Sequence, residues 1–129
     1  MKGEQDINAI GCCTGKLSTQ GGIEGQGEAC GLGVFYAVRE LFDTKSLLDK
    51  AGFREGGIEG KTFMVQGLGK VGYPAAKAIV EAGGLVTTIV EANSSVHNPR
   101  GLDVDAVKNY FSDRGTLWGF EKSQESFKQ

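Results

Sequence analysis

The sequence predicts an α/β fold built on a β-α-β core with flanking helices. Three observations lead to this prediction: a short apolar run at 61–66, a helical pattern at 70–82 and a second apolar run at 85–90. Both runs are rich in strand-forming residues, and short continuous apolar runs are typical of buried parallel strands. The glycine-rich stretch VQGLGKVG, residues 65–72, joins the first run to the helical pattern.

A long helix is predicted before this core and a shorter one after it. Apolar residues recur at three- and four-residue spacing through 26–50, and such a stripe marks the buried face of a helix. The expected buried residues are Cys30, Val34, Ala37, Val38, Leu41, Phe42 and Leu48. Asp103 is expected to cap a helix over 103–112. We expect a loop over 93–101 and find no usable period from Gly115 onward.

Composition excludes several classes of function. The 129 residues are 40% apolar and 23% charged, as in a globular domain or part of one. The net charge is −2 and lysine and arginine form no cluster, so neither nucleic acid nor an anionic membrane is an expected partner. The apolar runs fall short of the roughly 20 residues that span a bilayer, so no membrane insertion is expected. Three cysteines and one histidine, at unsuitable spacings, predict reduced thiols and no metal site.

The stretch 65–72 has the G-x-G-x-x-G pattern of a dinucleotide-binding turn. In this pattern Gly67 makes the tight turn, Gly69 lets the backbone approach a pyrophosphate, and Gly72 lets the helix pack closely on the strand. The helix N-terminus adds a partial positive charge that attracts the pyrophosphate. The candidate cofactor-binding residues of the loop are Gly67, Leu68, Gly69, Lys70, Val71 and Gly72.

Glu91 stands at the end of the second predicted strand, 19 residues after Gly72. A carboxylate there accepts hydrogen bonds from the ribose hydroxyls of NAD and repels the 2′-phosphate of NADP. Strand, turn, helix, strand and acid together predict a partial Rossmann-like, doubly wound nucleotide-binding unit that takes NAD, with NADP as the alternative. Residues 26–129 form this partial dinucleotide-binding domain, and residues 1–25, rich in glycine and small polar residues, form an interdomain or loop segment.

Each of these features also has a plainer interpretation. Glycines fall at this spacing by chance, so the β-α-β unit can be one that binds nothing. Glu91 can be an exposed acid at a strand end, and Lys70 either offers its charge to phosphate or is a solvated lysine. His97 is expected in a loop. Because only two strands are expected, the sheet has little core, and we expect more polypeptide or neighbouring subunits to complete it.

Five stretches of the sequence carry a resemblance to a known family. They are DINAIGCCTGK, QGGIEG, ACGLGVF, KTFMVQGLGKVG and HNPRGLD. Together and in this order, they resemble the start of the NAD-binding domain of the hexameric glutamate dehydrogenases, in the animal-mitochondrial form. The resemblance covers nearly the whole chain. It implies the oxidative deamination of glutamate to 2-oxoglutarate and ammonia with NAD or NADP. It also implies a place in the mitochondrial matrix, with the cytoplasm as the alternative.

The resemblance implies roles for further residues. Cys30 would lie near the nicotinamide, and Asn93 and Ser94 would line the adenosine side of the cofactor. Where the family usually reads R-x-x-A-T-G, this chain reads QGEACG at 26–31. Gln26 therefore replaces an arginine and Cys30 replaces a threonine, which removes a fixed charge and weakens a hydrogen-bonding group.

Two functions are compatible with this pattern. The family's catalytic lysine and aspartate and its glutamate-binding lysines belong to the preceding domain, so no catalytic residue is expected in this chain. Lys70 replaces the usual asparagine of the glycine loop, while the three motif glycines and Glu91 are intact. The chain is expected to be the NAD-binding segment of a glutamate dehydrogenase, not catalytic by itself. The alternative is a non-catalytic, dehydrogenase-derived structural or interaction subunit of a larger assembly.

Overall fold

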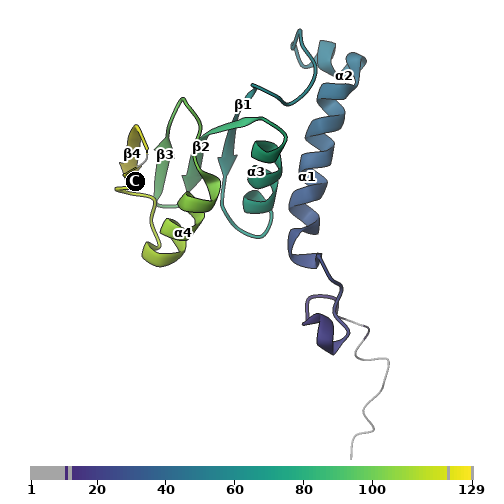
Figure 1. The fold of residues 1–129 in the computed structure, drawn as a ribbon, viewed down its shortest axis with the longest axis vertical. Coiled ribbons are helices and arrows are strands. Elements are labelled where there is room, and N and C mark those ends of the chain that lie inside the picture. The colour runs from purple at the N-terminus through teal and green to yellow at the C-terminus, as the bar shows by residue number, and fades with distance from the viewer. Residues whose placement is uncertain (1–10, 12, 122, 129) are drawn as a thin grey trace, which may run out of the picture.

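The computed structural model describes residues 11, 13–121 and 123–128, so part of the expected interdomain segment 1–25 lies outside the described residues. Helices and strands alternate along most of the chain (Figure 1). In order, the elements are the 3-10 helix η2 (Ser18–Gln20), α1 (Gln26–Asp43), α2 (Lys45–Lys50), β1 (Thr62–Gln66), α3 (Gly72–Glu81), β2 (Leu85–Glu91), β3 (Ser94–His97), α4 (Val104–Arg114) and β4 (Glu125–Lys128).

The four strands form one mixed sheet in the order β1-β2-β3-β4. β1 pairs in parallel with β2, as the β-α-β prediction requires, and the other two pairings are antiparallel. The expectation of only two strands was wrong. β3 and β4 have four residues each and contain few large apolar side chains, so neither gives a strong strand pattern in the sequence.

The segment expected as a loop over 93–101 begins with strand β3 instead. A two-residue turn at Ala92 and Asn93 reverses the chain, so that Glu91 pairs with Ser94. His97 was expected in a loop but lies in this strand, where its Nδ1 is 2.9 Å from the hydroxyl of Thr88. The short turn carries no glycine, which is why the hairpin was missed.

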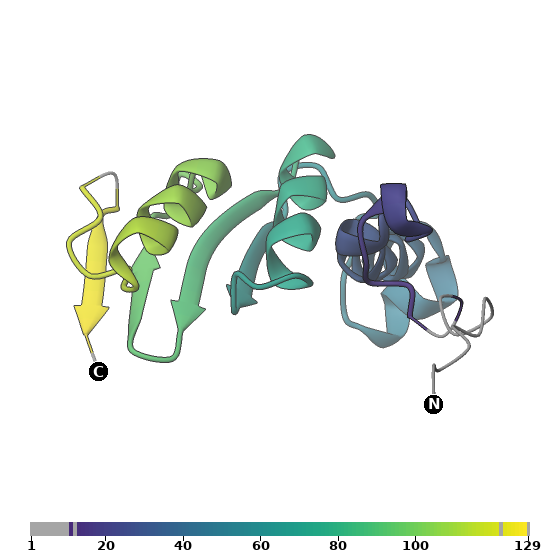
Figure 2. The same cartoon turned by 90° about the horizontal axis from the view of Figure 1, so that it is seen from below.

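The helices α3 and α4 lie on the same side of the sheet (Figure 2). The core fills the space between them and includes Val86 and Ile89 of β2, Val96 of β3, Ile79 of α3 and Val107 of α4. The opposite face of the sheet is not covered by any helix within the described residues (Figure 2). Large apolar side chains on the sheet are exposed, among them Met64 to 70% and Phe127 to 54%.

The helix expected over 26–50 is divided at Thr44, whose extended backbone separates α1 from α2. The predicted buried face is only partly correct. Phe42 and Leu48 are buried and Val38 and Leu41 pack against the core, as expected. Cys30, Val34 and Ala37 are exposed instead, and Gly31 is buried against α3. A Cβ at Gly31 would lie 2.6 Å from the carbonyl oxygen of Val71. The absence of a side chain at Gly31 lets the two helices approach closely, and this contact determines which face of α1 turns inward.

The remaining predicted elements agree with the structure. The predicted strands 61–66 and 85–90 are β1 and β2, and the predicted helix 70–82 contains α3. Asp103 caps α4 as predicted, because its Oδ1 accepts a hydrogen bond from the N–H of Ala106 at 3.0 Å. Among the described helices, none has the length and apolar character to cross a membrane.

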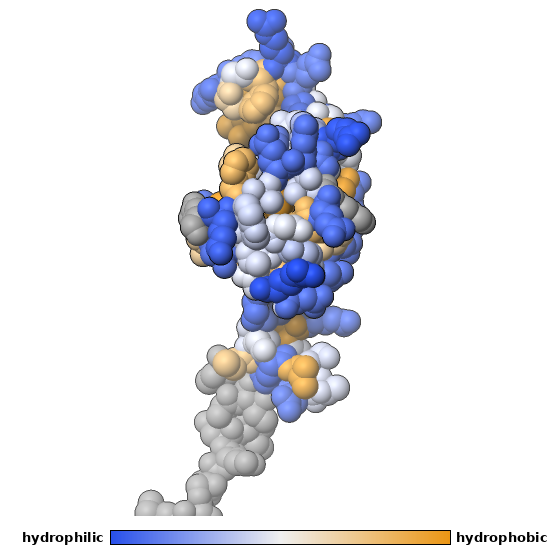
Figure 3. Space-filling view, turned by 90° about the vertical axis from the view of Figure 1, so that its left-hand side faces the viewer, coloured by the Kyte–Doolittle hydropathy of each residue, from blue (hydrophilic) through white to orange (hydrophobic). Residues whose placement is uncertain are grey.

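The free edge of β4 forms one end of the sheet (Figure 3). Seen from this end, the surface is mostly hydrophilic, with hydrophobic residues in separate areas (Figure 3). Glu125 and Lys128 place charges on this edge strand. Charged side chains on an edge strand discourage pairing with another chain.

Candidate dinucleotide site

The glycine loop follows β1 and leads directly into α3. Gly67 has a φ of 85°, which favours glycine, and its N–H donates to the carbonyl of Val90 at 2.7 Å. A Cβ at Gly72 would lie 1.8 Å from the carbonyl oxygen of Gly67, so any side chain there would displace the loop. A Cβ at Gly69 would meet nothing within 4 Å. Gly67 and Gly72 therefore shape the loop, while Gly69 lies against open space.

Backbone donors gather at the start of α3. In the described part of the chain, the N–H groups of residues 69–72 donate to no backbone acceptor. The N-cap residue Val71 gives no side-chain cap, and Pro74 has no N–H of its own. N–H groups at a helix N-terminus attract an anion, and the helix dipole adds to this attraction. These residues fit a pyrophosphate.

Glu91 lies against the loop. Its Oε1 accepts a hydrogen bond from the N–H of Leu68 at 2.6 Å, and the side chain is half-buried. This contact joins the end of β2 to the turn after β1, so the predicted acid and the predicted loop are in direct contact. The second carboxylate oxygen forms no hydrogen bond among the described residues.

Lys108 of α4 also contacts the loop, although no sequence pattern predicted this contact. Its Nζ donates to the carbonyl of Leu68 at 2.8 Å, across 40 residues of sequence. The Leu68 side chain itself is 1% exposed and belongs to the core. A single half-buried lysine on a helix has no motif, so only the folded structure can reveal this contact.

Lys70 and Val71 are exposed at the start of α3. The Lys70 side chain makes no ion pair with another described residue, and both interpretations of this lysine stay open. Val71 is 45% exposed. Both residues offer backbone N–H groups to the site.

The side chains of Asn93 and Ser94 form hydrogen bonds at the β2-β3 hairpin and with the segment after α4, and none with the glycine loop. Asn93 donates from Nδ2 to the carbonyl of Gly115 at 3.1 Å. Ser94 is 1% exposed, and its Oγ donates to Asn93 Oδ1 and accepts the N–H of Leu117. The structure therefore gives both residues contacts with the segment after α4, and leaves Ser94 inaccessible.

Cys30 lies on α1 next to Gly31, the residue that packs on the start of α3. Its thiol is free and exposed. Gln26, one turn earlier, donates to the hydroxyl of Thr14 at 3.5 Å. Cys30 therefore lies beside the contact between α1 and α3. Among the described residues, its thiol makes no contact with the glycine loop.

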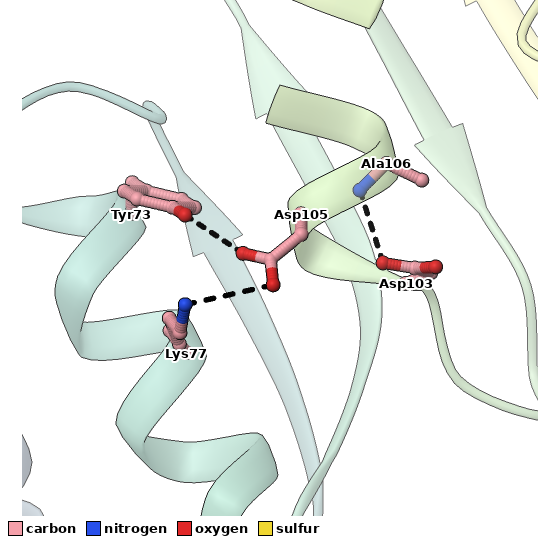
Figure 4. Close-up of polar contacts among 5 residues, drawn as sticks. All are labelled: Tyr73, Lys77, Asp103, Asp105 and Ala106. Atoms are coloured by element: carbon pink, nitrogen blue, oxygen red, sulfur yellow. Dashed lines mark hydrogen bonds and ion pairs between the residues drawn. The ribbon is translucent and has the colours of Figure 1, made fainter. Parts of the chain in front are cut away.

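A polar bridge joins α3 to α4 beside the loop (Figure 4). The Tyr73 hydroxyl donates to Asp105 Oδ1 at 2.7 Å, and Lys77 Nζ lies 3.6 Å from Asp105 Oδ2. The hydrogen bond from Tyr73 lowers the pKa of Asp105, and the same hydrogen bond raises the pKa of Tyr73. The negative charge of Asp105 raises the pKa of Lys77. The bridge links the first turn of α4 to Tyr73 and Lys77 of α3.

The described residues contain no group of three or more histidine, cysteine, aspartate or glutamate side chains that could hold a metal ion. The polar groups around the loop are backbone N–H donors, the Glu91 carboxylate and the ammonium groups of Lys70 and Lys108.

Comparison with known proteins agrees with this arrangement. Residues 21–129 match the family described as Glutamate/Leucine/Phenylalanine/Valine dehydrogenase. The chain is 44% identical over 115 residues to the mitochondrial glutamate dehydrogenase of Dictyostelium discoideum, covering 89% of this chain and 23% of that protein. It is 37% identical over 121 residues to the NADP-specific glutamate dehydrogenase A1 of Halobacterium salinarum, covering 94% and 27%.

Solved structures give the same result. The hetero-hexameric glutamate dehydrogenase of Thermus thermophilus superposes with a TM-score of 0.65 at 32% identity, covering 82% of this chain and 23% of that one. Glutamate dehydrogenase 2 of Plasmodium falciparum has a TM-score of 0.70 at 20% identity over 94% and 27%, which supports the fold alone. The chain spans about a quarter of the length of these relatives. These four relatives come from an amoeba, an archaeon, a bacterium and a parasite, so they do not establish the animal subtype. The chain belongs to the glutamate/leucine/phenylalanine/valine dehydrogenase family.

Proposed function

We propose that this chain is the NAD-binding segment of a glutamate dehydrogenase and is not catalytic by itself. The observation that carries the proposal is the joining of Glu91 to the glycine loop, beside backbone N–H groups at the start of α3. This combination matches both ends of the adenosine diphosphate part of a dinucleotide, a ribose and a pyrophosphate.

Each loop residue has a specific part in the proposal. Gly67 and Gly72 give the loop its shape, and Gly69 leaves room for the pyrophosphate. The N–H groups of Lys70 and Val71 add donors to that of Gly69. The second carboxylate oxygen of Glu91 accepts hydrogen bonds from the hydroxyl groups of the adenosine ribose. Its charge disfavours a 2′-phosphate, which is the reason for proposing NAD rather than NADP.

The reaction is proposed for the longer enzyme of which this would be a segment. In it, glutamate and water would give 2-oxoglutarate and ammonia, and NAD, when bound, would supply the two-electron oxidant for this reaction. The names of the relatives support glutamate as the substrate. The roles proposed for Cys30 near the nicotinamide and for Asn93 near the adenosine belong to the same hypothesis. The Ser94 side chain is buried, so Ser94 would contribute to the cofactor site only through the hydrogen bond that its hydroxyl donates to Asn93 Oδ1.

The direct test is titration of the full chain with NADH, followed by cofactor fluorescence. We expect saturable binding that Gly69→Ala weakens, because the added methyl group occupies space reserved for the pyrophosphate. Gly33→Ala is the matched control, since a Cβ there also meets nothing within 4 Å but lies on α1. Absence of binding to the unmodified chain at near-millimolar NADH would exclude a working site.

The uncovered face of the sheet favours a second candidate function. Met64 and Phe127 are largely exposed there, as on a surface that other polypeptide covers. The chain would then be a non-catalytic structural or interaction subunit, with neighbouring subunits completing the sheet. The intact mass of the native polypeptide separates the two candidates. A mass several times 13.7 kDa supports the dehydrogenase segment, and a mass near 13.7 kDa with other proteins bound supports the subunit.

A location in the mitochondrial matrix is part of the proposal, with the cytoplasm as the alternative. The Dictyostelium relative, which is named as mitochondrial, supports it. Cell fractionation, with the native protein detected by mass spectrometry, tests this assignment.

A further inference from the structure

We infer that Lys108 is a positioning residue of the dinucleotide site, which orients the peptide bond between Leu68 and Gly69. The inference rests on the proposed function, because it concerns how the same loop receives a pyrophosphate. It adds a residue on α4 that lies outside the strand, loop and helix of the motif.

The two contacts of Leu68 hold two successive peptide groups. Its N–H belongs to the peptide shared with Gly67 and donates to Glu91 at 2.6 Å. Its carbonyl belongs to the peptide shared with Gly69 and accepts from Lys108 Nζ at 2.8 Å. Side chains from β2 and α4 therefore fix the backbone on both sides of one loop residue.

The second contact determines where the N–H of Gly69 points. In a planar trans peptide the carbonyl and the following N–H point in opposite directions. Because Lys108 holds the carbonyl of Leu68, the N–H of Gly69 is directed away from α4. This N–H is one of those that donate to no backbone acceptor in the described part of the chain.

Gly69 needs such an anchor more than another residue would. It has no side chain, and a Cβ built there would touch nothing within 4 Å, so side-chain packing does not restrict its backbone. Its carbonyl accepts the Tyr73 N–H at 3.2 Å, which holds the following peptide. Lys108 supplies the hydrogen bond to the preceding peptide, and without it the Gly69 N–H loses that restraint on its direction. A charged donor also polarises the peptide, which makes the N–H a stronger donor to an anion.

The surroundings of Lys108 hold it in this role. Its Nζ lies 6.0 Å from the centre of the Tyr73 ring, and the Tyr73 hydroxyl is fixed by Asp105. Among the described residues its ammonium group is in no ion pair, and it donates to the carbonyl of Leu68 at 2.8 Å. The side chain is half-buried, where a charge-assisted hydrogen bond is stronger than in water.

The test compares Lys108→Met and Lys108→Arg with the unmodified full chain. Methionine keeps an unbranched stem and removes the donor, whereas arginine keeps a charged donor. Lys50→Met, at the end of α2, controls for the loss of one positive charge. Two quantities are measured: the dissociation constant for NADH by fluorescence, and the amide exchange rate and nitrogen chemical shift of Gly69 in the ligand-free chain.

We expect Lys108→Met to weaken NADH binding about tenfold and to change the Gly69 amide, with both effects largely restored by arginine. Equal binding by the methionine variant overturns the inference. Weaker binding with an unchanged Gly69 amide also overturns it, because the lysine would then act on the ligand directly. Failure of arginine to restore either quantity overturns it as well. If the unmodified chain binds no NADH, the proposed function fails, and the Gly69 amide still decides whether Lys108 orients the peptide.

Discussion

At the residue scale, the three motif glycines serve different physical needs. Gly72 is required because its α-carbon lies against the carbonyl of Gly67, and Gly67 is required because of its positive φ. Gly69 meets neither condition, since it lies against open space. Substitutions at these positions therefore separate the stability of the loop from its capacity to bind.

The first prediction concerns Gly72→Ala. The methyl group would lie 1.8 Å from a backbone oxygen, so we expect the free energy of unfolding to fall by more than about 2 kcal/mol. Gly69→Ala should leave it within about 0.5 kcal/mol of the unmodified value, because nothing contacts the added group. Urea unfolding followed by circular dichroism measures both. Equal stability of the two variants would contradict the steric explanation of Gly72.

The second prediction concerns the charge of Glu91. Glu91→Gln keeps an oxygen that accepts the Leu68 N–H and removes the negative charge beside the proposed ribose site. We expect the affinity for NADPH relative to NADH to rise about tenfold, because repulsion of the 2′-phosphate is lost. Competitive fluorescence titration measures this ratio, with Glu81→Gln at the end of α3 as the control. An unchanged ratio would place the ribose elsewhere.

At the scale of elements, the sequence predicted those that have a clear period and missed those that depend on distant pairing. The strands β1 and β2 and the helices α3 and α4 all lie close to their predicted bounds. β3 and β4 are short and polar, and they become strands because His97 pairs with Glu125 and Val96 with Ser126. Such pairs join residues far apart in sequence, and no local pattern contains them.

The candidate site divides in the same way. The glycine loop and Glu91 could be found from the sequence, because their spacing has a mechanical meaning in a β-α-β unit. The contact of Lys108 with Leu68 depends on how α4 packs on the sheet. The inward position of Ser94 likewise depends on the segment after α4, which donates the Leu117 N–H to it. Neither feature has a sequence pattern.

The third prediction is a pH dependence of the bridge between α3 and α4. The pKa of Asp105 is lowered from its ordinary value of 3.8, so its contribution to stability is present above that pH and is lost as the pH falls through the lower folded value. The pKa of Tyr73 is raised from 10.0, so its contribution is present below that pH and is lost as the pH rises through the higher folded value.

Tyr73→Phe tests this bridge, because it removes the hydroxyl that hydrogen-bonds to Asp105. The pKa of Asp105 should rise toward its ordinary value, measured by nuclear magnetic resonance of the carboxyl carbon. Tyr110→Phe, which removes a hydroxyl bonded to the carbonyl of Trp118, is the matched control. A pKa of Asp105 that stays low in Tyr73→Phe would assign the shift to Lys77 instead.

At the scale of the whole molecule, the sheet is covered on one face only (Figure 2). Sheets with parallel strands usually carry helices on both faces, because both faces are apolar. Here the uncovered face mixes apolar residues, such as Met64 and Phe127, with polar ones, such as Thr88 and His97. This face is consistent with the expectation that further polypeptide completes the fold.

The fourth prediction follows from this exposed face. The ligand-free chain should bind the fluorescent dye anilinonaphthalene sulfonate, which reports accessible apolar surface. Met64→Lys should reduce the bound dye, because Met64 is 70% exposed on the sheet. Leu17→Lys, at a residue that is 69% exposed outside the sheet, should reduce it less. Equal reduction by the two variants would show that the sheet face is not a distinct apolar surface.

The two-residue turn between β2 and β3 has a consequence for the order of folding. A hairpin with so short a connection forms within roughly 1–10 μs, whereas β1 pairs with β2 only after the intervening α3 segment has closed. We expect the pulse-labelled amides of Ile89 and Val96, which pair within the hairpin, to be protected before that of Gly67, which donates to Val90. Simultaneous protection would contradict this order. If the hairpin forms first, Glu91 reaches its position at the end of β2 before the glycine loop folds against it. The nucleotide site would be among the last parts of the molecule to assemble.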